Sequence, residues 1–524
     1  MRRAAAAIVA LSMVGVLATA CTGQASPTPS GSAEPNALST VPPPRDAAVT
    51  VTDESVAAAV AALPGIVRTA MNATGVPGVA VGVVHDGKVV FAEGYGVRDL
   101  STGAKVDSGT VFPLASVSKS IGATVVAAAV GKGIVGWDTP VVRSLPEFAL
   151  SDPWVTAHVT IGDMYAHRSG LYEHAGDELE DIGYSRAEVL NRLRQIPLDP
   201  FRSTYAYGNF DITAAAESVS RAAGEDWAAL SQRLVYDPLG MRHTHSTYAE
   251  LAAEEDRAVG HVPDGKGWKV SDPQRMPDAQ SPAGGASSSV DDMLIWMRMV
   301  LDEGGSAIPA SALLPAITPE IVGGMPESSA DRPGFYGYGF NVGTTSGGLV
   351  DVNHSGAFLL GTGTTFSLLP AAGLGIVVLT NGQANGIAEA ISAQFRDLAQ
   401  YGHARQDWLS LFRARFQGMT APVGETAGKQ PPSSATPAQP LAAYAGTYAN
   451  DYYGPATVSV QCDGLELRLG PSGRWLLTHW DGDRFVFELD GENGPAGSRS
   501  LATFDGNTLR LEFFDQHGLG TFRR

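Results

Sequence analysis

Two kinds of apolar pattern divide the central part of the chain into predicted strands and helices. Short extended runs, several of them rich in Val and Thr, predict strands at 79–84, 88–92, 349–360, 364–369 and 374–380. Ala-rich runs that continue through Val130 and from 212 to 223 predict helices between them. Because the strands lie at both ends of this region, we expect a single antiparallel sheet formed from both ends, with helices packed on it and beside it. The segment 85–87 is expected to be a hairpin turn.

The C-terminal part of the chain has a different pattern. Residues 440–524 contain short alternating runs, at 456–460, 465–469, 475–478, 484–489 and 508–513, separated by Gly, Asp and Asn. This pattern predicts a small antiparallel β-barrel or sandwich. Two linkers rich in Ser, Thr and Pro divide the chain. The expected divisions are 1–21, 22–55 (a tether), 56–417, 418–439 (a Pro-rich linker) and 440–524.

The N-terminal segment 1–21 is expected to be an export signal rather than part of the fold. Two arginines precede an apolar run, 4–17, that is short for a membrane span but suits an export signal. The segment ends in Ala-Thr-Ala-Cys, and small residues directly before a cysteine resemble a bacterial lipobox, although leucine is more usual than alanine three positions before the cysteine. Lipidation of Cys21 would anchor the protein in the membrane of a bacterial envelope, whereas cleavage after Ala20 alone would release it.

Composition limits the classes of partner and cofactor. The 524 residues, 44% of them hydrophobic, can bury a large core and form more than one domain. A net charge of −18 without a basic patch argues against nucleic acid as a partner. The only cysteine besides Cys21 is Cys462, and no Cys/His cluster is present, so we expect no disulfide, metal site or cofactor.

The first candidate for chemistry is a serine followed three residues later by a lysine. Of seven lysines, Lys119 alone has a serine, Ser116, at this spacing. The spacing places both side chains on one face of a helical turn, at a predicted helix start. A lysine amine held deprotonated by a dry site can accept the serine proton and so activate a nucleophile.

Two further motifs follow in order. Tyr207 and Asn209 belong to a Tyr-Gly-Asn motif before a predicted helix: the tyrosine can relay a proton, and the asparagine amide can hold a substrate carbonyl. His354 begins a His-Ser-Gly motif on an extended run, and Gly356 there allows close backbone approach. The backbone N–H groups of Ser116 and Ala357 are expected to form an oxyanion hole.

Similar motifs elsewhere in the chain do not follow the order in which the serine, tyrosine and histidine motifs must occur. Tyr448 fits the second motif, and His85 and His174 fit the third. Tyr448 comes after the His-Ser-Gly motif, His85 precedes the serine, and His174 precedes the tyrosine. No Gly-x-Ser-x-Gly sequence is present, which argues against the α/β-hydrolase route to serine chemistry.

Over residues 60–400 the chain resembles the class C β-lactamase-like superfamily of serine hydrolases, which includes esterases, D-aminopeptidases and D,D-carboxypeptidases. Besides the three motifs, the matching segments are 76–80, 94–96, 167–171, 238–241, 282–285 and 336–340. The resemblance implies an α+β fold, an antiparallel sheet with packed helices of the β-lactamase/transpeptidase type. The segment 444–448 resembles the start of a lipocalin-like domain found in some members, which implies a small all-β barrel at the C-terminus.

Carried over by position, Ser116 resembles the acylated nucleophile, Lys119 its partner, Tyr207 the general base and Asn209 the contact to the substrate amide. His354 stands where penicillin-recognising members have lysine. Histidine is only partly charged near neutral pH, so efficient β-lactam hydrolysis is not expected. The resemblance therefore implies a hydrolase that cleaves small esters or peptides through an acyl-enzyme.

Two questions stay open at the level of sequence. A protein that retained the fold and motifs but acylates slowly or not at all would be an envelope binding or sensing module. An acidic run at 177–181 is typical of solvated surface, and the alternative is a role at the pocket entrance. The sequence does not indicate the natural substrate, the oligomeric state or whether the C-terminal domain caps the pocket.

Overall fold

The computed structural model describes residues 41–42, 45–461, 464–489 and 491–524. The chain separates into a unit spanning 1–46 and a unit spanning 47–524, and every helix and strand named below lies in the second. Both cysteines, and the whole predicted signal segment 1–21, lie outside the described residues. The lipidation of Cys21 therefore stays a prediction.

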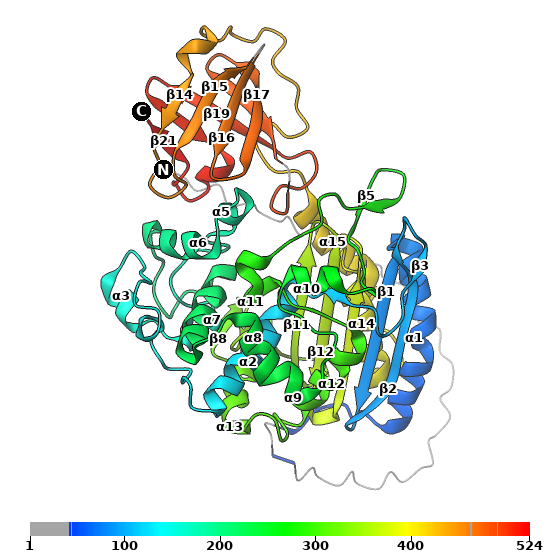
Figure 1. Ribbon diagram of the computed structural model, residues 1–524. Coiled ribbons are helices and arrows are strands. Elements are labelled where there is room, and N and C mark those ends of the chain that lie inside the picture. Colours follow the sequence, from blue (N-terminus) through cyan, green and yellow to red (C-terminus); the bar gives the residue numbers. More distant parts are fainter. Residues whose placement is uncertain (1–40, 43–44, 462–463, 490) are drawn as a thin grey trace, which may run out of the picture. The chain divides into compact units, whose positions relative to one another are not determined.

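A nine-stranded antiparallel sheet forms the centre of the fold (Figure 1). Its strands, in spatial order, are β3 (Ala104–Lys105), β2 (Lys88–Asp99), β1 (Gly78–His85), β13 (Leu374–Thr380), β12 (Thr362–Leu369), β11 (Val350–Phe358), β10 (Asn341–Thr344), β9 (Gly334–Tyr336) and β8 (Ile321–Gly324). The pairing of β1 with β13 joins the two ends of the domain, as the sequence predicts. Asp86 and Gly87 both have positive φ angles in the predicted hairpin turn.

Two helices cover one face of this sheet, α1 (Asp53–Thr74) and α14 (Ile387–Tyr401) (Figure 1). Thr52 caps α1 by accepting the backbone N–H of Ser55, so this helix begins inside the predicted tether. By length and composition α1 could cross a membrane, but six of its residues are buried, and its apolar residues share a core with β1, β13 and α14. It is therefore a core helix.

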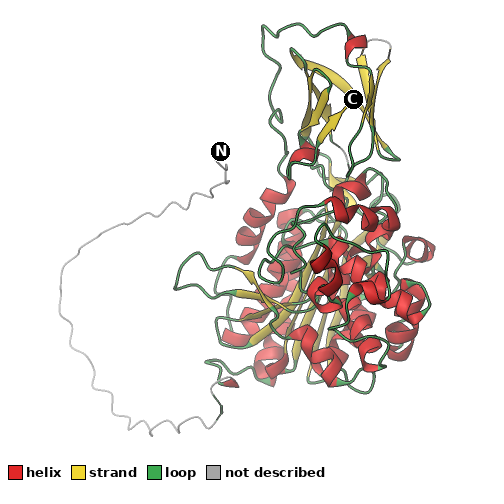
Figure 2. Cartoon of the chain, turned by 90° about the vertical axis from the view of Figure 1, so that its left-hand side faces the viewer, coloured by secondary structure: helices red, strands yellow, loops and turns green. Residues whose placement is uncertain are grey.

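Further helices pack on the opposite face and beside the sheet, so that helices enclose it (Figure 2). They are α2 (Ser118–Gly131), α3 (Pro153–His158), α4 (Ile161–Tyr165), α5 (Asp177–Asp181), α6 (Arg186–Arg192), α7 (Asn209–Ala223), α8 (Trp227–Ser231), α9 (Asp237–Leu239), α10 (Tyr248–Ala253), α11 (Ser281–Gly284), α12 (Val290–Leu301) and α13 (Ala310–Leu313). Two ribbons pair β4 (Phe112–Pro113) with β7 (Ser287–Ser288), and β5 (His261–Pro263) with β6 (Trp268–Val270). Small residues make α2 the central helix, buried from Ser118 to Ala129.

The C-terminal domain is a nearly closed antiparallel barrel of eight strands in sequence order. They are β14 (Gly446–Tyr448), β15 (Ala456–Gln461), β16 (Gly464–Leu469), β17 (Gly473–Asp481), β18 (Arg484–Glu488), β19 (Arg499–Asp505), β20 (Thr508–Leu511) and β21 (Thr521–Arg523). Ala449 and Arg523 exchange backbone hydrogen bonds and so join the first strand to the last. The predicted all-β barrel is confirmed. The helix α15 (Trp408–Thr420) precedes it and extends past the expected domain boundary at residue 417.

Candidate active site

Ser116 lies in a single 3₁₀ turn, Ala115–Val117, that leads directly into α2. Leu114 fixes the entrance to this turn by donating its backbone N–H to the carbonyl of Ala286 at 2.8 Å. Ala115 has a φ of +48°, a left-handed conformation that costs an alanine about 1–2 kcal/mol. The packing around the turn therefore holds the serine in a position that an unconstrained chain would not favour.

The buried Lys119 side chain has three polar neighbours. Its Nζ lies 2.6 Å from Asn209 Oδ1, 3.0 Å from the Ala283 carbonyl and 3.1 Å from Ser116 Oγ. The first two oxygens can only accept hydrogen bonds. A neutral amine has two N–H groups to donate to them, and its lone pair then faces the Ser116 hydroxyl. The geometry therefore suits transfer of the serine proton to the lysine.

Burial allows the neutral form of the Lys119 amine to be well populated near neutral pH. Loss of solvent lowers the pKa of Lys119 to about 7, because the charged form is poorly solvated in the core. The negative charges of Asp177 and Asp211 oppose this shift but do not cancel it. A large fraction of the amine is thus deprotonated at neutral pH, whereas an exposed lysine would be almost fully charged.

Tyr207 lies against the same amine, with Lys119 Nζ 4.6 Å from the centre of its ring. Burial raises the pKa of the Tyr207 hydroxyl far above its usual value, although a hydrogen bond with Ser116 partly opposes the shift. The tyrosine is therefore a neutral phenol. In this state it can donate a proton but is a poor base, whereas the resemblance implies that it is the base.

His354 is buried beneath the pocket rather than exposed in it. Its Nδ1 lies 2.7 Å from the Ser355 carbonyl, which can only accept, so Nδ1 carries the hydrogen. The Tyr336 hydroxyl donates to Nε2 at 2.9 Å. Burial, and then the charge of Lys119, lower the pKa of His354 to about 3. The ring is therefore neutral at neutral pH rather than partly charged.

Gly356 permits close contact between β11 and the turn that contains Ser116. A Cβ at this position would lie 2.3 Å from the Leu114 carbonyl and 2.9 Å from the Ser116 backbone nitrogen. No side chain fits there, so the backbone of β11 approaches that of Ser116 directly. This contact brings the predicted oxyanion donors, Ser116 and Ala357, to the same end of the pocket.

We expect Gly356→Ala to lower kcat/KM for a short ester by about 100-fold, because the methyl group pushes β11 away from the turn that contains Ser116. Gly343→Ala is the matched control: this glycine lies in the neighbouring strand β10, where an added methyl group would meet no heavy atom within 4 Å. Steady-state kinetics and the melting temperature of both variants measure the effect. Equal activity of the two variants would contradict the proposed contact.

A cavity of about 480 Å³ opens in front of Ser116. Five predicted site residues line it: Ser116, Tyr207, Asn209, Gly356 and Ala357. The remaining lining residues are His174, Asp177, Arg275, Gln280, Ser355, Phe358, Leu359, Phe416, Met419, Val423, Glu492, Asn493 and Pro495. The structure thus brings the three sequence motifs together at one pocket. Lys119 and His354 lie behind its wall.

The acidic run is not a solvated surface, and its first residue lines this pocket. Asp177 is only 5% exposed and lines the cavity, and Glu180 pairs with Arg275 at 2.6 Å. Burial raises the pKa of both Glu178 and Asp181 to about 7. The expectation of a solvated run is therefore wrong, and Asp177 lies at the pocket, as the alternative predicts for the run.

The C-terminal barrel supplies part of the pocket wall through the loop between β18 and β19. The Glu492 carboxylate accepts the backbone N–H groups of Leu359 and Leu360 at 2.7 and 3.2 Å. Asn493 donates its side-chain amide to Asp181 at 2.8 Å. Burial raises the pKa of Glu492 to about 8, although Arg275 opposes this shift. No local sequence signal marks these residues, because their partners are more than one hundred residues away.

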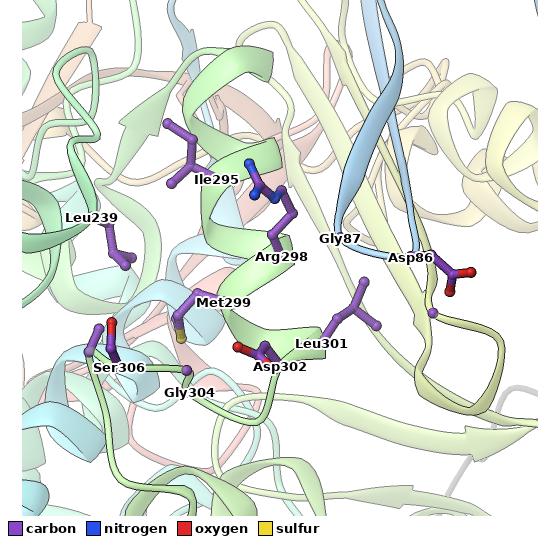
Figure 3. Close-up of a pocket in the computed structure, with 13 residues that line it drawn as sticks. Asp86, Gly87, Leu239, Ile295, Arg298, Met299, Leu301, Asp302, Gly304 and Ser306 are labelled. Carbon is purple, nitrogen blue, oxygen red and sulfur yellow. The ribbon is translucent and has the colours of Figure 1, made fainter.

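Another cavity, of about 610 Å³, is lined by residues of α12 and of the β1–β2 hairpin, among them Arg298, Met299 and Asp86 (Figure 3). Ser306 is the only hydroxyl side chain among its lining residues, and no lysine or histidine accompanies it. The cavity contains no residue of the three motifs.

Within the described residues, Asp53, His85 and Asp86 have ligand atoms within 4.8 Å of one another. The two aspartates are exposed, and such groups are common at surfaces without an ion. Nothing else at this position indicates a metal.

Comparison with known proteins shows the family. A family model described as Beta-lactamase matches residues 63–400, more than half of the chain. The chain belongs to the β-lactamase family. It is a serine hydrolase of that family, as its sequence predicts. A second model, a domain of unknown function (DUF3471), matches residues 430–516.

Three relatives are named for hydrolytic activities. The chain is 28% identical to "Unguisins hydrolase ungD" of Aspergillus violaceofuscus, over 72% of this chain and 73% of that one. It is 28% identical to "Esterase EstB" of Burkholderia gladioli, over 60% of this chain and 88% of that one. It is 26% identical to a "D-aminopeptidase" of Cereibacter sphaeroides, over 67% of this chain and 66% of that one.

A solved structure shows the same fold. It is the octameric penicillin-binding protein homologue from Pyrococcus abyssi, with a TM-score of 0.60 and 19% identity over 89% of this chain and all of that chain. The predicted α+β fold, with a β-lactamase/transpeptidase-like domain, is confirmed. The predicted lipocalin-like character of the barrel stays a prediction.

Proposed function

We propose that this serine hydrolase cleaves ester or amide bonds in small esters or peptides through an acyl-enzyme on Ser116. The observation that carries the proposal is the position of Lys119, a buried amine whose two acceptor partners leave its lone pair for Ser116. The names of the relatives support both bond types, since they include an esterase and a D-aminopeptidase.

Acylation begins when Lys119 takes the Ser116 proton and Oγ attacks the substrate carbonyl carbon. The carbonyl oxygen becomes an oxyanion, which the backbone N–H groups of Ser116 and Ala357 stabilise. The neutral Tyr207 hydroxyl donates a proton to the leaving oxygen or nitrogen as the bond breaks. Lys119 then returns its proton to Tyr207, and the ester of Ser116 remains.

Deacylation repeats these steps with water as the nucleophile. Water loses a proton to Lys119 and attacks the ester carbonyl, and Ser116 leaves after regaining a proton. The free carboxylic acid is released. Atoms and protons balance without a metal or an organic cofactor.

The neutral His354 supports an esterase or peptidase function over efficient β-lactam hydrolysis. The resemblance gives penicillin-recognising members a lysine charge at this position for the substrate carboxylate. His354 has a pKa of about 3 and supplies no such charge. Arg275 lines the pocket, but its charge is already paired with Glu180.

The proposed site of action is the bacterial envelope, with the chain held at a membrane by a lipid on Cys21. The small residues before Cys21 support lipidation. Labelling by a fatty acid in the full-length protein, and its loss in Cys21→Ala, would distinguish lipidation from plain release; equal labelling of both would exclude it.

The test is hydrolysis of para-nitrophenyl butyrate and of a D-alanine anilide by the protein without residues 1–21, at about pH 5 to pH 9. We expect turnover, with kcat/KM rising as pH increases through about 7, because only neutral Lys119 accepts the Ser116 proton. Acylation without turnover would support a sensing protein instead. A rate independent of pH across this range would contradict the role of Lys119.

A further inference from the structure

Asp177 is a buried carboxylate that the acyl-transfer steps do not use. It is the first residue of α5 and is 5% exposed. Its Oδ2 accepts the Asn209 amide N–H at 2.9 Å and lies 2.9 Å from His174 Nδ1. Its other oxygen, Oδ1, is buried without a hydrogen-bond partner among the described residues. Desolvation of such a group is costly, so its position calls for an explanation.

Asn209 connects this carboxylate to the lysine. Its Nδ2 donates to Asp177, and its Oδ1 accepts from Lys119 Nζ at 2.6 Å. Rotating the amide by half a turn would place two donors, Nδ2 and Nζ, against each other and two oxygens, Oδ1 and the carboxylate, against each other. Both hydrogen bonds would be lost. Asp177 therefore selects one of the two amide orientations.

We propose that Asp177 is a positioning residue for acyl transfer, which holds the Asn209 amide so that its oxygen faces Lys119 and the amine lone pair faces Ser116. The proposal rests on the proposed function. It assigns to Asp177 a specific role that the charge pattern of the acidic run does not indicate. It also means that one N–H of Asn209 is already engaged, so at most the second is free to contact a substrate amide.

The charged surroundings of this chain of hydrogen bonds come from several elements. Asp211 of α7 is buried near Lys119 and accepts the Ser169 hydroxyl. His167 and His354, whose pKa values are lowered mainly by burial, are neutral there. Glu178, Glu180 and Asp181 share α5 with Asp177, and Arg275 pairs with Glu180.

His174 contacts Asp177 at the pocket mouth. Burial lowers the pKa of His174, but the hydrogen bond and charge of Asp177, followed by the charge of Glu173, outweigh this effect and raise it overall. Lys119 also responds to Asp177, whose charge opposes the lowering of its pKa. Removing the carboxylate charge should therefore lower the pKa of Lys119 further, a change that a purely structural residue would not cause.

Two variants of Asp177 distinguish its effect on the orientation of the Asn209 amide from the effect of its negative charge. Asp177→Asn keeps an oxygen that can accept from Asn209 but removes the charge, so we expect a fall in kcat of less than about tenfold and a shift of the acid limb of kcat/KM to lower pH. Asp177→Ala removes both, and we expect kcat to fall by about 100-fold with the same shift, while KM changes little.

Glu173→Gln is the matched control, because it removes one negative charge from an exposed side chain four residues before Asp177. We expect its kcat and acid limb to equal those of the parent protein. Titration with a fluorophosphonate, which counts reactive Ser116, and the melting temperature identify any variant that has lost its fold. The near-isosteric Asp177→Asn keeps the test informative if Asp177→Ala does not fold.

An unshifted acid limb in folded Asp177→Asn would overturn the proposal, as would an equal shift in Glu173→Gln. Parent-level kcat in folded Asp177→Ala would overturn it as well. Failure of the proposed function gives a different result, because the parent protein would then show no turnover that depends on Ser116.

Discussion

Replacing Ser116 with alanine is expected to lower turnover of para-nitrophenyl butyrate by about 10⁴-fold or more, while the melting temperature stays unchanged. The variant has no oxygen that can form the acyl-enzyme. Lys119 loses one neighbour but keeps Asn209 and Ala283. The Tyr207 hydroxyl loses its hydrogen bond with Ser116, but it lines the pocket, where water can replace that bond. Initial rates and thermal unfolding of the purified variant measure both effects.

Ser118→Ala is the appropriate comparison, since Ser118 lies two residues away in the same segment. Its Oγ accepts the backbone N–H of Ala286 at 2.9 Å. Loss of this bond should lower the free energy of unfolding by about 1–3 kcal/mol, with turnover retained. A Ser116→Ala variant as active as Ser118→Ala would exclude Ser116 as the nucleophile.

Lys119→Met is expected to lower kcat by about 10³-fold or more and to remove the dependence on pH near 7. Methionine fills a similar volume but cannot accept a proton. The acceptors Asn209 Oδ1 and Ala283 O lose their donor, so we also expect the free energy of unfolding to change. The pH profile of kcat/KM and the melting temperature report these two effects separately.

Lys105→Met serves as the control, because Lys105 is an exposed lysine on the edge strand β3. Its rate and pH profile should match those of the parent protein. Lys119→Met with kcat within tenfold of the parent would show that another group accepts the serine proton.

The sequence predicts the nucleophile, its partner and the sheet because these depend on short-range spacing. Ser116 and Lys119 are three residues apart, and one helical turn suffices to bring them together. The extended runs at 79–84 and 374–380 pair as β1 and β13 because both are apolar and must be buried. Order along the chain then distinguishes Tyr207 from similar motifs.

The rest of the site depends on burial and on distant contacts, which local patterns do not encode. The acidic run has the composition of a surface segment, yet Arg275 and the barrel residue Asn493 cover it. From sequence alone, a histidine at position 354 is partly charged near neutral pH. In the structure, burial lowers its pKa and the Tyr336 hydroxyl contacts its Nε2, so the ring is neutral. His174 precedes Tyr207 and so does not belong to the third motif, but it contacts Asp177 at the pocket.

The most direct test of the central claim is to find the acyl group. The protein without residues 1–21 would be mixed with para-nitrophenyl butyrate, quenched with acid during turnover and digested, and the peptides analysed by mass spectrometry. We expect a butyryl group on the peptide containing Ser116, specifically on that serine, and no such group in Ser116→Ala. Turnover with the butyryl group on another residue, or with no acylated peptide and unchanged activity in Ser116→Ala, would contradict the account.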